Sequence, residues 1–173
     1  MKIEITKELL EKARDYIPIA EKEAWAAEIA PLCFSQLSIT ADGNAMPSMY
    51  MVNTGLKSRY LMAALCTMYF GMPIENSGEK LMTEEEYDSW AGSHVFNQLE
   101  RWKRDADVKY KAFDLAFDYK DLEKRLSTQI SGLLAAQNDM VVRMAQDTAA
   151  QVKALPEILD ALKELQKKES TPN

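Results

Sequence analysis

The sequence predicts an all-α protein in which an N-terminal bundle of short helices is followed by a long amphipathic, coiled-coil-like helix and a short C-terminal helix. Glycine and proline, the residues that interrupt helices, occur only 6 times each among 173 residues. Apolar residues recur at helical spacing along most of the chain. The stretch from Val108 to Leu155 contains no proline and a single glycine, Gly132. These three observations favour long, uninterrupted helices over strands.

The domain organisation follows from the length of that last stretch. A chain of 173 residues suits one domain of ordinary size. A continuous helix over 108–155 would be about 70 Å long, more than the roughly 30 Å diameter of a small domain. Part of it is therefore expected to project, to pair with another chain or to bend. We predict a helical globular region over 1–106 with an irregular segment at 32–53, a region over 107–168 that holds the long helix and the C-terminal helix, and a disordered tail over 169–173.

Two short helices are predicted at the N-terminus. Thr6 is suited to cap the first, with Glu8 in the turn where the helix dipole favours a negative charge. Pro18 should end or kink this helix and begin a second one that runs to about Ala30. The side chains of the second helix that are expected to pack are Ala20, Ala24, Trp25 and Ala27, and those expected to face water are Glu21, Lys22, Glu23 and Glu28.

The irregular segment at 32–53 allows two interpretations. Asp42-Gly43-Asn44 is a turn signal, and the apolar residues on either side of it could pair as a short hairpin. The apolar residues in question are Phe34, Leu37, Ile39, Met49, Met51 and Val52. Met46-Pro47 favours an irregular extended segment instead. We favour a loop with a turn of helix and keep the hairpin as the alternative.

The third predicted helix is the most hydrophobic and should form the centre of the core. Asn53 or Thr54 caps it, and it runs to Phe70, where Gly71 and Pro73 provide a stop. A polar loop around Asn76-Ser77-Gly78 is expected after it. The apolar run over 60–72, about 13 residues, is shorter than the roughly 20 that a membrane-spanning helix needs. We therefore expect a buried core helix and no membrane span.

The fourth predicted helix begins with a capping box and runs to about Arg104. Thr83 and Glu86 have the spacing at which each side chain bonds the backbone amide of the other. One face of this helix is expected to carry Tyr87, Trp90, His94, Val95, Leu99 and Trp102. Asp105-Ala106-Asp107 is read as a break and a new cap, with a straight continuation of the helix as the alternative.

The long helix carries a row of inward-facing positions at mostly alternating steps of three and four residues, which is typical of a helix packed on a near-parallel partner. We call this row the seam, and its members are Leu122, Leu126, Ile130, Leu133, Gln137, Met140, Met144, Thr148, Gln151 and Leu155. The helix could pack inside one chain, but we favour a self-associating coiled coil because the N-terminal helices are short and largely occupied with each other. The polar members of the seam are expected to fix register and oligomer number. Pro156 begins the final helix, which either folds back or continues with a kink.

No motif for chemistry is present in the sequence. His94 is the only histidine, so Ser-His and Cys-His mechanisms must use it, and a structural role on the Trp90 face is the better interpretation. Cys33 and Cys66 have none of the close spacings of zinc sites, and no glycine-rich phosphate loop occurs. The acidic run Glu84-Glu85-Glu86 is explained by the first turn of a helix. We predict a protein that is not an enzyme and needs no cofactor or metal.

The most basic stretch mixes cationic and aromatic side chains. Its residues are Arg101, Trp102, Lys103, Arg104, Lys109 and Lys111. Such a mixture can bind nucleic-acid phosphates and stack on bases. Glu100, Asp105 and Asp107 weaken its field, and the formal net charge of −6 works against a polyanion as partner. A solvated helix face is the better interpretation, so nucleic acid is disfavoured as a partner.

The function that these observations predict is a structural or interaction protein that forms a homo-oligomer through its long helix. An assembly or accessory factor of a phage or mobile element would be one instance. The alternative is an accessory protein that binds nucleic acid through Arg101–Lys111. The two cysteines are expected to be unpaired and buried, and the charged N-terminus lacks the apolar core of a signal peptide. The expected location is therefore cytoplasmic.

Overall fold

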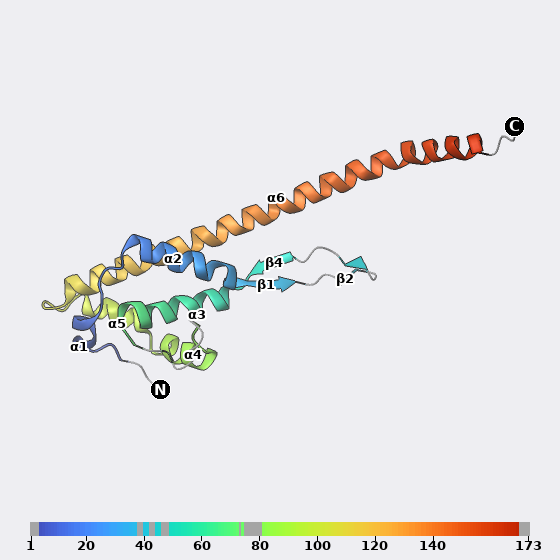
Figure 1. Ribbon diagram of the computed structural model, residues 1–173. Coiled ribbons are helices and arrows are strands. Elements are labelled where there is room, and N and C mark those ends of the chain that lie inside the picture. The colour runs from blue at the N-terminus through green and yellow to red at the C-terminus, as the bar shows by residue number, and fades with distance from the viewer. Residues whose placement is uncertain are drawn as a thin grey trace. The chain divides into compact units, whose positions relative to one another are not determined.

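The computed structural model describes residues 4–37, 40–41, 44–45, 49–72, 74 and 81–169, and its helices dominate (Figure 1). Several short helices precede one long helix, so the predicted all-α class is confirmed. Contacts divide the chain into two compact units, Met1–Ser131 and Gly132–Asn173. We call them unit 1 and unit 2. Unit 1 therefore extends beyond residue 106, where the sequence suggested a boundary, and includes the first part of the long helix.

The N-terminal segment of unit 1 contains α1 (Lys7–Lys12) and α2 (Ile19–Ile29). Thr6 caps α1 as predicted, because its hydroxyl accepts a hydrogen bond of 3.2 Å from the amide of Leu9. The helix ends well before Pro18, however. The backbone after it is extended and is held by tertiary bonds, such as the one of 2.8 Å from the amide of Arg14 to the carbonyl of Tyr69. A 3-10 turn, η1 (Ala30–Cys33), follows α2 and contains Pro31.

A β-hairpin follows η1, so the favoured prediction of a loop with a turn of helix was wrong. Strand β1 (Phe34–Leu37) pairs antiparallel with β4 (Met49–Val52), and β2 (Thr40–Ala41) pairs with β3 (Asn44–Ala45). The amide of Asn53 donates to the carbonyl of Cys33 over 2.7 Å just beyond the first pair. Hydrogen bonds between the strands satisfy the backbone polar groups of this segment. Such bonds depend on residues far apart in the sequence, so local sequence preferences do not reveal them. Ile39, Asp42-Gly43 and Met46-Pro47 lie outside the described residues.

The centre of the core is α3 (Thr54–Ala64) with the π-helical turn η2 (Leu65–Tyr69) that continues it. Asn53 caps α3 by accepting a hydrogen bond of 3.0 Å from the amide of Leu56. The buried side chains of this element are Tyr60, Leu61, Met62, Ala63, Ala64, Leu65, Cys66 and Tyr69. Gly71 has a positive φ of 62°, which suits the predicted stop because glycine has no side chain to clash there. Pro73 and Asn76-Ser77-Gly78 lie outside the described residues.

Two helices replace the single fourth helix that the sequence predicted: α4 (Glu84–Gly92) and α5 (Val95–Trp102). The capping box of Thr83 and Glu86 is present as predicted. The helix stops at Ser93 because His94 adopts a left-handed conformation, with φ 51° and ψ 48°. His94 is exposed and does not share the buried face of Trp90, so its predicted structural position was wrong. The side-chain amide of Gln98 closes the end of α4 by donating 2.8 Å to the carbonyl of Ser93.

The long helix α6 (Lys109–Glu169) begins after a turn and continues through Pro156. The amide of Asp107 donates to the side chain of Asp105 over 3.0 Å, and the amide of Lys109 donates to the carbonyl of Asp105 over 2.9 Å. The predicted break is therefore confirmed. The C-terminal segment is part of the same helix and not a separate one, although Pro156 removes one backbone hydrogen bond. Because α6 includes Glu169, the rest of the predicted tail, 170–173, lies outside the described residues.

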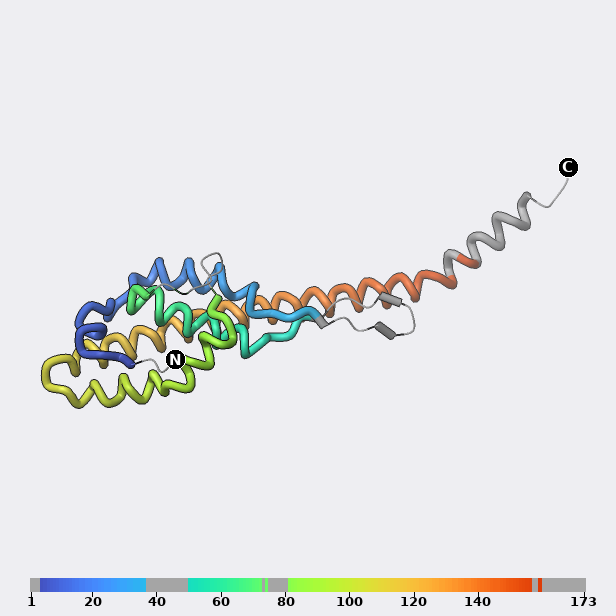
Figure 2. Tube along the Cα trace, turned by 90° about the horizontal axis from the view of Figure 1, so that it is seen from below, coloured from blue at the N-terminus to red at the C-terminus, as the bar shows by residue number. Residues whose placement is uncertain are grey.

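The first part of α6 lies among the helices of unit 1 (Figures 1 and 2). Contacts with η2, α5 and α3 agree with this view. The ring of Tyr119 lies 6.0 Å from that of Tyr69 and 5.5 Å from that of Phe96. The ammonium of Lys57 on α3 donates 3.0 Å to the hydroxyl of Ser127. The side chains of α6 and its preceding turn that are buried in this unit are Val108, Ala112, Leu115, Asp118, Tyr119, Leu122, Leu126 and Ile130.

Candidate functional site

A buried ionic cluster joins α2 to α6. The ammonium of Lys22 lies 2.6 Å from a carboxylate oxygen of Asp118 and 2.7 Å from one of Asp121. The prediction that Lys22 faces water was wrong, since only 2% of the residue is exposed. The sequence pattern of α2 placed it among charged neighbours, whereas the packing of α2 on α6 turns it inward. A buried ammonium is tolerated here because two carboxylates compensate its lost hydration.

Asp118 is the centre of this cluster. Its second carboxylate oxygen accepts hydrogen bonds of 2.9 Å from the amide of Ile17 and 2.8 Å from the hydroxyl of Tyr69. One carboxylate thereby joins the segment before α2, the helix α2 itself and the core turn η2. Among the described residues, no buried side-chain nitrogen or oxygen lacks a hydrogen-bond partner. The cluster is therefore a satisfied structural network.

Charge coupling shifts the pKa values of this cluster in the directions that strengthen it. Burial by itself lowers the pKa of Lys22, but the hydrogen bonds to Asp118 and Asp121 outweigh it and raise that pKa above 10.5. Hydrogen bonds from Lys22 and Arg125 hold the pKa of Asp121 below 3.8. Burial, and then the bond to Asp118, raises the pKa of the Tyr69 hydroxyl. At neutral pH, Lys22 and Asp121 therefore stay charged, and the hydroxyl of Tyr69 keeps the proton that it donates to Asp118.

Asp121 gives the stability of unit 1 a dependence on acid pH. Because folding lowers its pKa, the carboxylate stabilises the folded state above its unfolded pKa, and this contribution is lost as pH falls through the folded pKa. We expect Asp121→Asn to lower the free energy of unfolding at pH 7, and the difference from the original protein to shrink below about pH 4. Urea unfolding at several pH values measures this. Asp114→Asn is the control, and a difference that stays constant with pH for Asp121→Asn would contradict the assignment.

The structure divides the seam between the two units. Leu122, Leu126 and Ile130 are buried in unit 1 and pack inside one chain. The remaining members belong to unit 2, where Gln137 is half-buried and the others are exposed. The exposed members are Leu133, Met140, Met144, Thr148, Gln151 and Leu155. The helical spacing is the same in both parts, so spacing did not distinguish a position in the core from one at the surface.

Unit 2 also exposes apolar side chains that the seam does not include. These are Val141, Val142, Val152 and Leu159. At 100° per residue, Val141, Val152 and Leu159 lie beside the seam and widen its apolar stripe, whereas Val142 lies on the opposite side of the helix. The wider stripe was detectable in the sequence, because Val141 and Val152 each follow directly after a seam position, Met140 and Gln151.

Most of the basic stretch is engaged in contacts within unit 1. The indole of Trp102 donates 2.8 Å to the carbonyl of Ile5, and the ammonium of Lys111 donates 2.5 Å to the carbonyl of Glu11. Lys103 pairs with Glu100 and lies over the ring of Phe113. Lys109 lies over the ring of Tyr110. These side chains are therefore distributed among separate local contacts.

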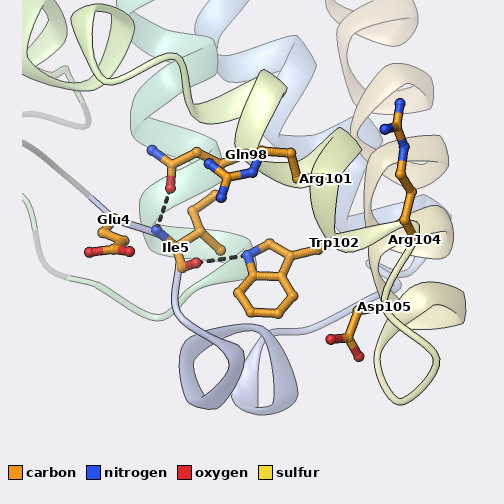
Figure 3. Close-up of a pocket in the computed structure, with 7 residues that line it drawn as sticks. All are labelled: Glu4, Ile5, Gln98, Arg101, Trp102, Arg104 and Asp105. Carbon is orange, nitrogen blue, oxygen red and sulfur yellow. Dashed lines mark hydrogen bonds between the residues drawn. The ribbon is translucent and has the colours of Figure 1, made fainter.

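The two arginines of that stretch line a shallow hollow of about 320 Å³ (Figure 3). Arg101 and Arg104 share it with Trp102 and with two acidic residues, Glu4 and Asp105. Figure 3 shows two hydrogen bonds among the lining residues, one from Trp102 to Ile5 and one of 2.7 Å from the amide of Ile5 to Gln98. The structure thus brings together Arg101, Trp102 and Arg104, but Lys109 and Lys111 do not line the hollow.

Both cysteines are unpaired and buried, as predicted. Burial raises the pKa of Cys33 to about 11 and that of Cys66 to about 12. The thiolate is the reactive form of cysteine, so both side chains are held in their unreactive, protonated form at neutral pH. They act as small apolar residues of the core.

The described residues offer neither a metal site nor a membrane span. Within the described ranges, no three His, Cys, Asp or Glu side chains are grouped so that they could hold a metal ion. No helix in the described part of the chain is both long and apolar enough to cross a membrane. Comparison of the chain with protein-family models, with curated proteins and with solved structures gives no match.

Proposed function

We propose that this chain is a non-enzymatic structural or interaction protein that self-associates through the apolar stripe of unit 2. The observation that supports this is the exposure of large apolar side chains along one helix. The members of the stripe are Leu133, Met140, Val141, Met144, Val152, Leu155 and Leu159. Contiguous apolar surface of this kind marks an interaction site, because exposing it to water is unfavourable.

A second copy of the chain is the partner that best fits the spacing. Leu133, Met144 and Leu155 recur every eleven residues, and an eleven-residue repeat keeps a row of side chains nearly straight along a helix. Identical parallel helices place each of these residues opposite its own copy. The polar positions Gln137 and Gln151 then meet their counterparts and pair by hydrogen bonds, which favours one register. A partner with a different sequence would have to carry amide side chains at the same spacing as Gln137 and Gln151.

Sedimentation equilibrium of the full chain tests this proposal. We expect a mass above the 19.6 kDa of one chain at tens of micromolar. Met144→Glu should return the protein to that mass, because a charge in a paired apolar stripe costs several kcal/mol of desolvation. Val142→Glu is the matched control, since Val142 is also exposed but lies on the opposite side of the helix, and it should leave the mass unchanged. A monomer at all concentrations would overturn the proposal.

The location and the biological setting are part of the same proposal. Two buried, unpaired thiols suit a reducing compartment and support a cytoplasmic protein. An assembly or accessory factor of a phage or mobile element remains one instance of such a protein.

Nucleic-acid binding through Arg101–Lys111 is the weaker alternative. It is supported by the exposed guanidinium groups of Arg101 and Arg104, for which the described residues provide no ion pair. It predicts that the chain retards DNA or RNA in a gel at low salt and that Arg101→Ala with Arg104→Ala abolishes the retardation. No retardation at low salt would exclude it.

A further inference from the structure

The outer face of α6 in unit 1 carries three exposed aromatic side chains. Tyr110, Phe113 and Phe117 follow one another at steps of three and four residues, which places them on one side of the helix. The other side carries Leu115 and Leu122, which are fully buried. Phe117 is 78% exposed, an unfavourable position for a phenyl ring. Several exposed apolar side chains on one face of a helix are a frequent feature of binding surfaces.

Phe117 lies at a groove that the segment before α2 completes. The groove has a volume of about 540 Å³, and its apolar lining consists of Tyr16, Ile19 and Phe117. All three side chains are at least half exposed. Charged side chains complete the lining: the carboxylates of Asp15 and Asp114, and the buried ionic cluster of Lys22, Asp118 and Asp121. We call this site the acid-rimmed groove.

The uncompensated charge of the groove is negative. Lys22 is neutralised by its two carboxylates, and Arg125 pairs with Asp121 and Glu23 over 2.9 and 2.7 Å. Among the described residues, neither Asp15 nor Asp114 makes an ion pair. These two carboxylates are therefore available to a cation from outside. The ring of Tyr16 already accepts a cation on one face, since the ammonium of Lys22 lies 5.4 Å from its centroid.

We propose that the acid-rimmed groove docks a basic amphipathic segment of a partner protein. Apolar side chains of that segment contact Tyr16, Ile19 and Phe117, while its Lys or Arg side chains pair with Asp15 and Asp114. Charge complementarity disfavours a second copy in a symmetric contact, because two-fold symmetry would place one acidic rim against another. The site lies within unit 1 and does not depend on self-association through unit 2.

A synthetic amphipathic helix of leucine and lysine, labelled with a fluorophore, is the probe for the full-length chain. We expect it to bind with a salt-dependent affinity, and a version with glutamate in place of lysine not to bind. Phe117→Ala should weaken binding about tenfold or more, as loss of a central aromatic residue does at protein interfaces. Asp15→Asn with Asp114→Asn should weaken it about threefold to tenfold and flatten the salt dependence.

Leu32→Ala is the matched control, because Leu32 is an exposed apolar residue of η1 that does not line the groove, and it should leave binding unchanged. Ile19→Ala is a second variant that should weaken binding if Phe117→Ala disturbs folding. Lack of binding to the lysine peptide would overturn the proposal, as would equal binding of a scrambled peptide. Unchanged peptide binding in Phe117→Ala, together with a reduced mass of the protein, would show that a second copy occupies the groove instead.

Discussion

Asp118→Ala is expected to lower the free energy of unfolding of unit 1 by about 3–5 kcal/mol, the usual cost of removing one partner of a buried ion pair. The substitution leaves the ammonium of Lys22 buried with Asp121 as its remaining partner. It also removes the acceptor for the amide of Ile17 and the hydroxyl of Tyr69. Each buried donor left without an acceptor adds to the loss. Urea unfolding followed by tryptophan fluorescence measures the change.

A double-mutant cycle separates the loss of the ion pair from the loss of the other bonds. Lys22→Met removes the ammonium but keeps most of the side-chain volume. If the unpaired charge causes the loss, the double variant Lys22→Met with Asp118→Ala should be less destabilised than the sum of the two single changes. Asp114→Asn, one turn earlier on α6 and exposed, should change stability by less than about 0.5 kcal/mol. An additive cycle would show that Asp118 acts mainly through Ile17 and Tyr69.

Leu122→Ala and Leu133→Ala are expected to affect different properties, although both residues belong to the seam. The first should lower the stability of unit 1, and the second should weaken self-association. Leu122 is 0% exposed in unit 1, and truncating it should cost about 2–5 kcal/mol of unfolding free energy. Leu133 is 41% exposed in unit 2, so its truncation should leave the unfolding of unit 1 within about 0.5 kcal/mol. The same truncation should weaken self-association, because it removes apolar area from the proposed interface.

Tryptophan fluorescence in urea reports on this difference because all three tryptophans lie in unit 1. They are Trp25, Trp90 and Trp102. Sedimentation equilibrium of the same variants measures self-association. Urea unfolding at low protein concentration measures the stability of unit 1 separately from self-association. Equal destabilisation of unit 1 by the two substitutions would contradict the division of the seam into a buried and an exposed part.

Local signals in the sequence located several helix boundaries correctly. Thr6, Asn53 and the Thr83–Glu86 capping box each accept a hydrogen bond from a backbone amide at the start of a helix. Asp105 marks the turn before α6 in the same way. These contacts involve residues three or fewer positions apart, so the information that specifies them is local.

The incorrect predictions concern segments whose structure depends on contacts with residues far away in the sequence. The hairpin of β1 and β4 was given less weight than a loop because Met46-Pro47 favours an irregular segment. Its pairing joins residues up to 18 positions apart, as in Phe34 and Val52, which local signals do not reveal. The left-handed His94 was also missed. Gly92 is a signal for a helix end that was not used, whereas His94 provides little signal because histidine is only moderately disfavoured in helices.

The helical class, the caps and the periodic row of apolar side chains along α6 follow directly from the amino-acid sequence, because composition and spacing act through local backbone preferences and helix geometry. The fold determines which members of that row are buried, since burial depends on which other elements reach the same face. The fold also buries Lys22, whose ammonium contacts Asp118 and Asp121. It leaves Phe117 exposed at the acid-rimmed groove. Residues of the same type and spacing thus became core in one part of the helix and surface in another, because packing partners and not periodicity remove a side chain from water.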